Sequence, residues 1–224
     1  MRFFAAAATA LTLLAAVPAT ASTTIYNATT EFNGAQGGSS GVWSYGMVSG
    51  GNFSSLTYIP GSNVFGRPGA NFDTPLVGAA DGNGDLLMHP GEFGELIVLR
   101  FTALTAGDYS ANFTTRLADA SCGGCGGTDG VIASLNGVSA IVDRPAGYLA
   151  STLNWNGFRA AGETIDFALD PRGNYGWDSI RASANVSVTG GVPEPTTWAL
   201  VILGFGGMGV AFRRQRGRAI RVVA

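Results

Sequence analysis

The stretch ELIVLRFTALTAGDYSANFTTRL, residues 95–117, contains the clearest strand pattern in the chain. Two β-rich runs, 95–104 and 108–117, are separated by a short segment that includes a glycine, as in strands joined by a turn. Alternate side chains of the second run fall on opposite faces of a strand, as a half-buried sheet requires. The inward set is Tyr109, Ala111, Phe113 and Thr115, and the outward set is Ser110, Asn112, Thr114 and Arg116.

Similar runs recur through residues 22–190. The stronger ones are 130–142, which contains an Asn136-Gly137 turn, 163–169 and 179–188, and the weaker ones are 23–29, 42–47 and 52–59. Ile165, Phe167 and Leu169 alternate with smaller or polar residues and are expected in the core. No long stretch has a helical period. We therefore predict an all-β fold, an antiparallel β-sandwich of jelly-roll type, as the exported body of the protein.

Composition and charge support an all-β body and argue against nucleic-acid binding. Glycine accounts for 34 of 224 residues and charged residues for only 12%, which favours turns over helices. Residues 22–190 contain 7 arginines and 14 acidic residues, a net charge of −7. This charge would repel a phosphate backbone, so we expect no nucleic-acid partner.

The first 21 residues have the layout of a secretory signal peptide. One arginine precedes an apolar run from Phe3 to Val17, and small residues follow at the end of the segment. We expect cleavage between Ala21 and Ser22, with an uncleaved membrane anchor as the alternative. The body is thus predicted to be exported.

The other end of the chain has the features of a single membrane-spanning helix. Residues 198–212 are 15 consecutive uncharged residues, about 22 Å as a helix, and a basic tail follows at 213–221. A flanking tryptophan and the trailing arginines suit a membrane interface, with the tail in the cytoplasm. A buried core helix is the alternative, although four glycines between Gly204 and Gly209 disfavour it.

Residues 191–218, GVPEPTTWALVILGFGGMGVAFRRQRGR, resemble the PEP-CTERM sorting segment, a type also labelled ice-binding protein C-terminal domain. The matching residues are Pro193, Glu194, Pro195, Trp198 and Ala199, followed by the apolar run and the basic end. The resemblance implies that an exosortase, a membrane transpeptidase of Gram-negative bacteria linked to extracellular polysaccharide production, recognises this segment. It also implies tethering at the inner membrane before delivery to the cell surface or extracellular matrix.

The body is similar to carbohydrate-binding-module-like jelly rolls over residues 89–188. The likeness lies in three segments in this order: FTALTAGDY (101–109), DGVIASLNG (129–137) and AGETIDF (161–167). WSYG at 43–46 is a further similar segment. These motifs are largely structural. The resemblance therefore implies the fold more directly than a ligand.

Two cysteines, Cys122 and Cys125, lie in a glycine-rich segment. A Cys-x-x-Cys pair can serve redox chemistry or form half of a zinc site in a reducing compartment. In an exported protein an even pair more often forms a disulfide, and no second pair of ligands completes a zinc site. We expect a small disulfide here.

Catalytic and metal-binding patterns are weak. The single histidine, His89, has no nucleophile motif nearby, and no catalytic residues are assigned. Carboxylate pairs for glycoside hydrolysis depend on spatial separation, which leaves a secreted polysaccharide hydrolase as an alternative. Four oxygen-bearing residues have the spacing of a calcium loop but lack its glycine and flanking helices, so a simple turn is the competing interpretation. They are Asp81, Asn83, Asp85 and Glu92.

Aromatic residues beside amides and carboxylates suggest a sugar site. Rings stack on the apolar faces of sugars while neighbouring polar groups orient the hydroxyls. The alternative for each ring is a place in the core. The candidate ligand-binding residues are Trp43, Tyr45, Trp155, Tyr175 and Trp177.

The sequence therefore predicts an exosortase-sorted, non-enzymatic surface or matrix protein that binds extracellular polysaccharide. It comprises a signal peptide (1–21), the body (22–190) and the sorting segment (191–218). A structural or adhesive matrix component without a discrete ligand site is the main alternative. No cofactor is required, with calcium as the one candidate.

Overall fold

The computed structural model describes residues 22–36, 41–67, 74–79, 84–118, 128–142, 150–189, 203–208 and 213. Ser22–Gly190 form one compact unit, the body, and Met1–Ala21 with Gly191–Ala224 form the other. In the second unit the described residues 203–208 are helical. No helix among the described residues is both long and apolar enough to cross a membrane.

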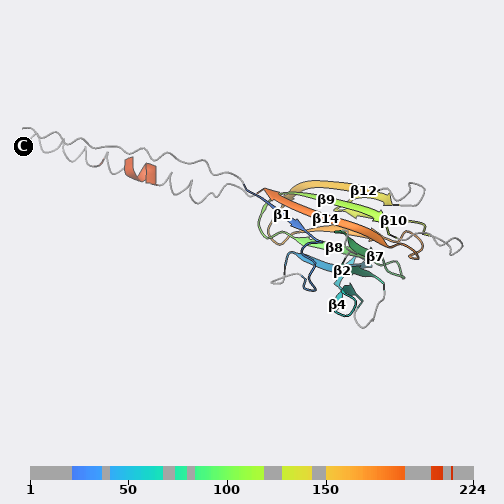
Figure 1. Ribbon diagram of the computed structural model, residues 1–224. Helices are drawn as coiled ribbons and strands as arrows, with labels where there is room; N and C mark the ends of the chain where they lie inside the picture. The colour runs from blue at the N-terminus through green and yellow to red at the C-terminus, as the bar shows by residue number, and fades with distance from the viewer. Residues whose placement is uncertain are drawn as a thin grey trace, which may run out of the picture. The chain divides into compact units, whose positions relative to one another are not determined.

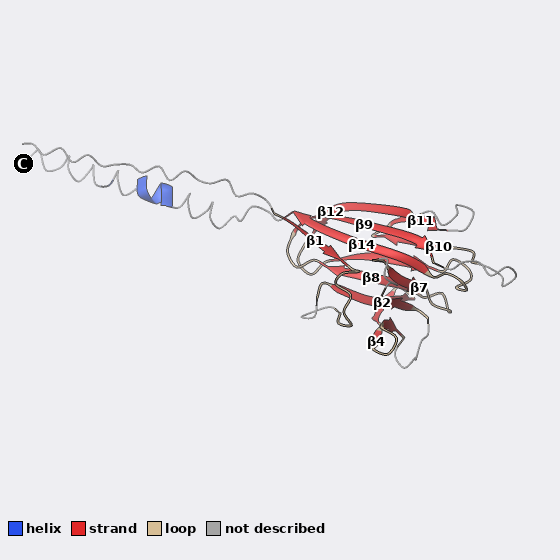
Figure 2. Ribbon diagram, viewed as in Figure 1, coloured by secondary structure: helices blue, strands red, loops and turns tan. Residues whose placement is uncertain are grey.

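The body is an antiparallel sandwich of two β-sheets, which confirms the predicted all-β class (Figures 1 and 2). The eight-stranded sheet has the order β12-β9-β14-β7-β6-β5-β4, and β1 also pairs with β14. Its strands are β1 (Thr23–Asn27), β4 (Thr57–Ile59), β5 (Val64–Gly66), β6 (Leu76–Gly78), β7 (Leu86–His89), β9 (Gly107–Leu117), β12 (Ser151–Arg159) and β14 (Ile180–Thr189).

The six-stranded sheet has the order β11-β10-β13-β8-β2-β3. Its strands are β2 (Trp43–Ser49), β3 (Asn52–Ser55), β8 (Leu96–Thr102), β10 (Val131–Leu135), β11 (Val138–Val142) and β13 (Thr164–Asp170). Asn136 and Gly137, with φ of 47° and 94°, form the turn between β10 and β11, as the Asn-Gly signal predicts.

The core lies between the sheets and follows the alternation read from the sequence. The predicted inward set of β9 is buried, and so are Ile165, Phe167 and Leu169 of β13. Every buried member of the core cluster lies between Ala28 and Val188. The hydrophobic core is thus contained in the body.

The strands that the sequence did not indicate are short or rich in polar residues. They are β5, β6 and β7, with three or four residues each, and β12, whose nine residues include two asparagines and a glycine. The predicted run 52–59 is two strands: Leu56 is buried between β3 and β4, which belong to different sheets. The chain therefore changes sheets at this residue.

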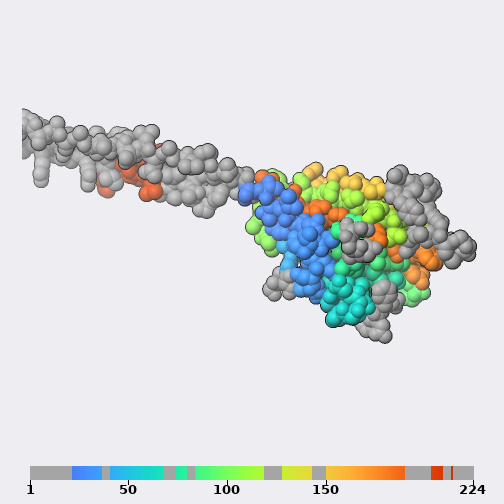
Figure 3. Space-filling view, in the orientation of Figure 1, coloured from blue at the N-terminus to red at the C-terminus, as the bar shows by residue number. Residues whose placement is uncertain are grey.

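The long strands β9 and β14 form the centre of one surface of the body. β12 pairs with β9 along its length, and β1 pairs with the last half of β14, from Thr23 opposite Thr189 to Asn27 opposite Asn185. In Figure 3 this surface runs along the top of the body, with the yellow-orange β12 region beside the green β9 region. Four strands thus present one continuous outward face.

Candidate functional site

Three strands of the eight-stranded sheet carry the same outward pattern, a hydroxyl residue followed by an asparagine two positions later. Because side chains alternate along a strand, these residues share the outer face while the apolar residues between them enter the core. The three segments are Ser110-Ala-Asn112-Phe-Thr114 on β9, Ser183-Ala-Asn185-Val-Ser187 on β14 and Thr152-Leu-Asn154-Trp-Asn156 on β12.

The strand register brings the asparagines into one row across four strands. Asn154 lies opposite Asn112, Asn112 opposite Asn185, and Asn185 opposite Asn27 of β1. We call these four residues the asparagine ladder. The row spans about 14 Å from β12 to β1, because neighbouring strands lie about 4.8 Å apart.

Hydrogen bonds run through the asparagine ladder in a single direction. Asn27 Nδ2 donates to Asn185 Oδ1 at 2.6 Å, and Asn185 Nδ2 donates to Asn112 Oδ1 at 3.4 Å. Asn112 Nδ2 then donates to Asn154 Oδ1, also at 3.4 Å. At the β1 end of the ladder, the backbone N–H of Thr30 donates to Asn27 Oδ1. Each bond polarises the next, which orients the four amides.

Three members of the ladder, Asn112, Asn154 and Asn185, line a groove of about 550 Å³ on this outer face. A second row lies next to it: Asn156 opposite Ser110, Ser110 opposite Ser187, and Ser187 opposite Ile25. The Ile25 side chain is 69% exposed. The groove-lining residues are Ile25, Ser110, Ala111, Asn112, Asn154, Asn156, Asn185, Val186 and Ser187.

The chemistry of the groove is neutral and suited to hydrogen bonding. Each asparagine has two N–H donors and two acceptor sites, so a ladder bond at each end leaves capacity for a ligand. Each serine hydroxyl both donates and accepts. No residue in the groove lining carries a carboxylate or a cation. The groove can therefore bind a polyhydroxylated, uncharged surface, while Ile25 supplies an apolar contact at one end.

On the outer face of the six-stranded sheet, an arginine, an aspartate and a phenylalanine contact one another. Arg100 donates from Nε and Nη2 to the two carboxylate oxygens of Asp166, each at 2.7 Å, and its guanidinium carbon lies 3.9 Å from the centroid of the Phe53 ring. The hydrogen bond to Asp166 raises the pKa of Arg100. The Phe53 ring also lies over Gly46. Val98, which pairs with Gly46 in the sheet, is buried. At this point of the face the polar side chains are therefore paired with each other.

Two of the predicted ligand-binding rings are in the core. Trp43 is 3% exposed and Tyr45 0% exposed, and they contact the rings of Phe101 and Phe65, respectively. Both residues point inward on β2 because the strand alternation places them on its apolar face. Both residues are thus core residues, which is the alternative that the sequence left open for each ring.

Trp155 also points inward, but at the edge of the sandwich. It is partly buried against the core, and the guanidinium carbon of Arg159 lies 4.2 Å from its ring centroid. Its neighbours Asn154 and Asn156 face outward into the groove. Trp155 itself therefore does not line the groove, whereas the two asparagines beside it do.

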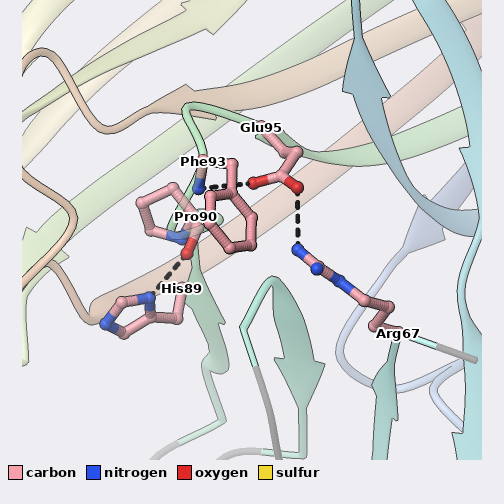
Figure 4. Close-up of polar contacts among 5 residues, drawn as sticks. All are labelled: Arg67, His89, Pro90, Phe93 and Glu95. Atoms are coloured by element: carbon pink, nitrogen blue, oxygen red, sulfur yellow. Dashed lines mark hydrogen bonds and ion pairs between the residues drawn. The ribbon is translucent and has the colours of Figure 1, made fainter. Parts of the chain in front are cut away.

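Tyr175 and Trp177 lie together in the loop between β13 and β14, and Trp177 is 42% exposed. The Tyr175 ring contacts the His89 ring, with centroids 6.0 Å apart. His89 Nδ1 donates to the carbonyl oxygen of Pro90 at 2.8 Å. His89 therefore makes structural contacts at the end of β7 (Figure 4).

Beside it, a partly buried ion pair holds the turn that follows β7 (Figure 4). Arg67 Nη2 donates to Glu95 Oε1 at 2.7 Å, and the backbone N–H of Phe93 donates to Glu95 Oε2 at 2.9 Å. The Arg67 guanidinium carbon lies 5.5 Å from the Phe93 ring centroid. Both carboxylate oxygens of Glu95 thus stabilise this turn.

The calcium-loop residues are only partly described. Asp81 and Asn83 lie outside the described residues, while Asp85 Oδ2 accepts from Arg116 Nη2 at 2.7 Å and Glu92 is exposed. Within the described ranges, no three His, Cys, Asp or Glu side chains are grouped as metal ligands. Cys122, Cys125, Ala21 and the sorting-motif residues Pro193, Glu194, Pro195, Trp198 and Ala199 also lie outside the described residues.

Sequence reasoning missed the asparagine ladder because it is assembled from distant segments. Asn27 and Asn185 are 158 positions apart, and the ladder forms only once the pairing of β1, β14, β9 and β12 is known. The repeated hydroxyl-x-asparagine pattern on β9, β12 and β14 was the available signal. It identifies the outward face of each strand but not the register between them.

Residues 191–216 match the PEP-CTERM protein-sorting motif, which confirms the resemblance found in the sequence. The motif indicates an exported protein that an exosortase processes at the membrane. No curated protein matches the chain.

Several solved structures are distantly similar. A family 29 carbohydrate-binding module complexed with cellulohexaose matches with 12% identity and a TM-score of 0.30, covering 50% of this chain and 73% of the module. A family 29 module from Piromyces equi also has 12% identity and a TM-score of 0.30, covering 75% of this chain and 92% of that one. A GH26-CBM35 β-(1,4)-mannanase from Podospora anserina has 13% identity and a TM-score of 0.31. This match covers 67% of this chain and 29% of the mannanase. With scores this low, the fold assignment rests on the strands and their register.

Proposed function

We propose that this chain is an exosortase-sorted surface or extracellular-matrix protein of a Gram-negative bacterium that binds extracellular polysaccharide through the groove on β12, β9, β14 and β1. The single observation that carries this proposal is the asparagine ladder in an open, uncharged groove. Sugars present many hydroxyls that both donate and accept, which amides and serines match. Ile25 adds a contact for apolar C–H groups.

The proposed function is binding without cleavage. Glycoside hydrolysis ordinarily requires two carboxyl groups on either side of the scissile bond. The groove lining contains asparagine, serine and apolar residues in their place. The groove chemistry thus favours a binding protein over the alternative of a secreted hydrolase.

The terminal segments supply the route to the surface. In this proposal, signal peptidase cuts between Ala21 and Ser22, and a helix at about 198–212 holds the precursor in the inner membrane with the basic tail in the cytoplasm. The Pro193-Glu194-Pro195 segment cannot continue a helix, which keeps it accessible to an exosortase. Processing there delivers the body to the matrix, where polysaccharide is its ligand.

The test is polysaccharide binding by the body, residues 22–190, measured by isothermal titration calorimetry against a panel of neutral and acidic polysaccharides. The double variant Asn112→Ala/Asn185→Ala removes the centre of the ladder and should weaken binding at least about tenfold, since two hydrogen bonds of about 1 kcal/mol each are lost. Asn52→Ala, an exposed asparagine on β3 outside the groove, is the matched control and should bind normally.

Three results would contradict the proposal. Failure of the folded body to bind any member of the panel would favour the structural matrix component. Equal binding by the ladder variant and the parent would remove the groove as the site. New reducing ends in the polysaccharide after incubation would show a hydrolase.

A further inference from the structure

The loop of residues 171–179, between β13 and β14, holds two side chains in an unfavourable backbone conformation. Four described residues other than glycine have positive φ, and two of them, Asn63 and Asn136, are asparagines, which tolerate it. The other two, Arg172 at 61° and Trp177 at 64°, both lie in this loop. A bulky residue in the left-handed region persists only where the surroundings enforce it, and such sites cluster at ligand contacts.

The contacts that enforce the conformation surround Trp177. Asp178 is completely buried and accepts a hydrogen bond from the Thr128 hydroxyl, which joins the loop to the segment before β10. The Ser179 carbonyl accepts from the backbone N–H of Ala118 at 2.8 Å. On the other side of Trp177, Asn174 Oδ1 accepts from the backbone N–H of Gly176 at 2.8 Å. The chain is thus fixed immediately before and after the tryptophan.

This fixed loop leaves a large aromatic ring at the surface. Trp177 is 42% exposed, whereas Trp43 is in the core and Trp155 packs against it. The loop therefore presents the indole outward at a cost to the backbone.

The loop that carries Trp177 also exposes polar groups. Asn174 and Arg172 of this loop and Asp129, whose carbonyl oxygen accepts from Arg172 Nη1 at 2.6 Å, are all exposed. An exposed aromatic ring in a loop that also exposes amide and charged groups suits a sugar ring, which has an apolar C–H face and hydroxyls at its edge.

We infer that Trp177 is the stacking platform of a second carbohydrate contact, separate from the groove, which binds a pyranose ring through its apolar C–H face. The carbohydrate class of this ligand rests on the proposed function. The two sites are distinct because the loop precedes Ile180, the first residue of β14, while the groove involves Asn185 and Ser187. Five residues of extended strand separate Ile180 from Asn185 by about 17 Å.

The experiment follows tryptophan emission of the full-length chain titrated with cellohexaose, mannohexaose, N-acetylchitohexaose and an alginate oligosaccharide, with calorimetry in parallel. At least one sugar should quench or blue-shift the emission. In Trp177→Phe this change should fall to less than about a fifth, because the exposed indole reports the contact. In Asn112→Ala/Asn185→Ala the emission change should persist while the calorimetric affinity falls.

Two further variants separate a ligand contact from a structural role. Trp177→Gly accepts the left-handed backbone without strain, so it should stay folded and lose the emission change. Phe93→Leu replaces another exposed ring, which is 75% exposed, and should retain the change.

The outcomes distinguish this inference from the proposed function. Calorimetric binding with an emission change that survives in Trp177→Phe or Trp177→Gly would overturn the Trp177 site and leave the groove standing. Loss of the emission change in the ladder variant would show that the two sites are not separate and would also overturn the inference. If no sugar produces heat or an emission change, both proposals fail.

Discussion

At the scale of single residues, Tyr45 shows how the core accommodates a polar group. Its ring stacks on Phe65, with centroids 4.5 Å apart and an interplanar angle of 22°. Burial raises the pKa of the Tyr45 hydroxyl above its ordinary value of 10.0, and the charge of Glu31 raises it further. Among the described residues, the buried hydroxyl has no hydrogen-bond partner. Folding therefore strongly disfavours ionisation of this group.

Replacing Tyr45 with phenylalanine should maintain or increase stability. Removal of an unsatisfied buried hydroxyl changes the free energy of unfolding by about +1 kcal/mol at pH 7. The pKa of Tyr45 is higher in the folded state than in the unfolded state. The free energy of unfolding of the wild type is therefore independent of this group below pH 10 and falls as the pH rises above 10. The variant lacks this loss. Urea unfolding at pH 7 and pH 11 should show its advantage growing with pH.

Tyr58→Phe is the matched control for this prediction. The Tyr58 hydroxyl donates to Asn63 Oδ1 at 2.7 Å, so its removal should lower stability by about 0.5–1.5 kcal/mol at pH 7. An advantage of Tyr45→Phe that is the same at pH 7 and pH 11 would contradict the assignment of a raised pKa to Tyr45.

At the scale of secondary-structure elements, the edge strand β12 depends on a glycine. A Cβ at Gly157 would stand 2.6 Å from Cζ2 of Trp155, so the indole occupies the space that a side chain would need. Trp155 is held from the other side by Arg159. This stack fixes the strand that supplies Asn154 and Asn156 to the groove.

Gly157→Ala should therefore lower the free energy of unfolding by about 1–3 kcal/mol, the usual cost of overpacking. It should also weaken polysaccharide binding, although Gly157 does not line the groove, because β12 shifts. Thermal melting and calorimetry measure the two effects. Gly61→Ala, where an added Cβ meets nothing within 4 Å, is the control. Normal binding by a destabilised Gly157→Ala would show that β12 does not position the groove.

The elements also show what the sequence could and could not predict. The alternation in 108–117 and 163–169 correctly assigned the inner and outer faces of β9 and β13, because side-chain period is a local property. β12 was missed because its asparagines and glycine lack the usual strand composition. The ladder required the register of four strands, which depends on contacts between distant segments.

At the scale of the whole molecule, the two outer faces of the sandwich have different chemistry. On one face Arg100, Asp166 and Phe53 bind each other, and on the other the asparagine ladder and two serines line an open groove. The strands β1 and β14 that complete the groove are also the first and last strands of the body. The groove and both ends of the body thus share one strand pair.

Removal of residues 191–224 should separate targeting from binding. The buried core cluster ends at Val188, so the truncated protein should fold with a melting temperature within about 1 °C of the full-length protein, a difference of less than about 0.5 kcal/mol. Its affinity for polysaccharide should be unchanged. Because the PEP-CTERM motif is absent, the protein should be exported but no longer processed by the exosortase. Mass spectrometry of cell and medium fractions, with calorimetry of the purified forms, measures these effects. Loss of binding on truncation would show that the terminal segment contributes to the site, whereas unchanged sorting would show that the motif is dispensable.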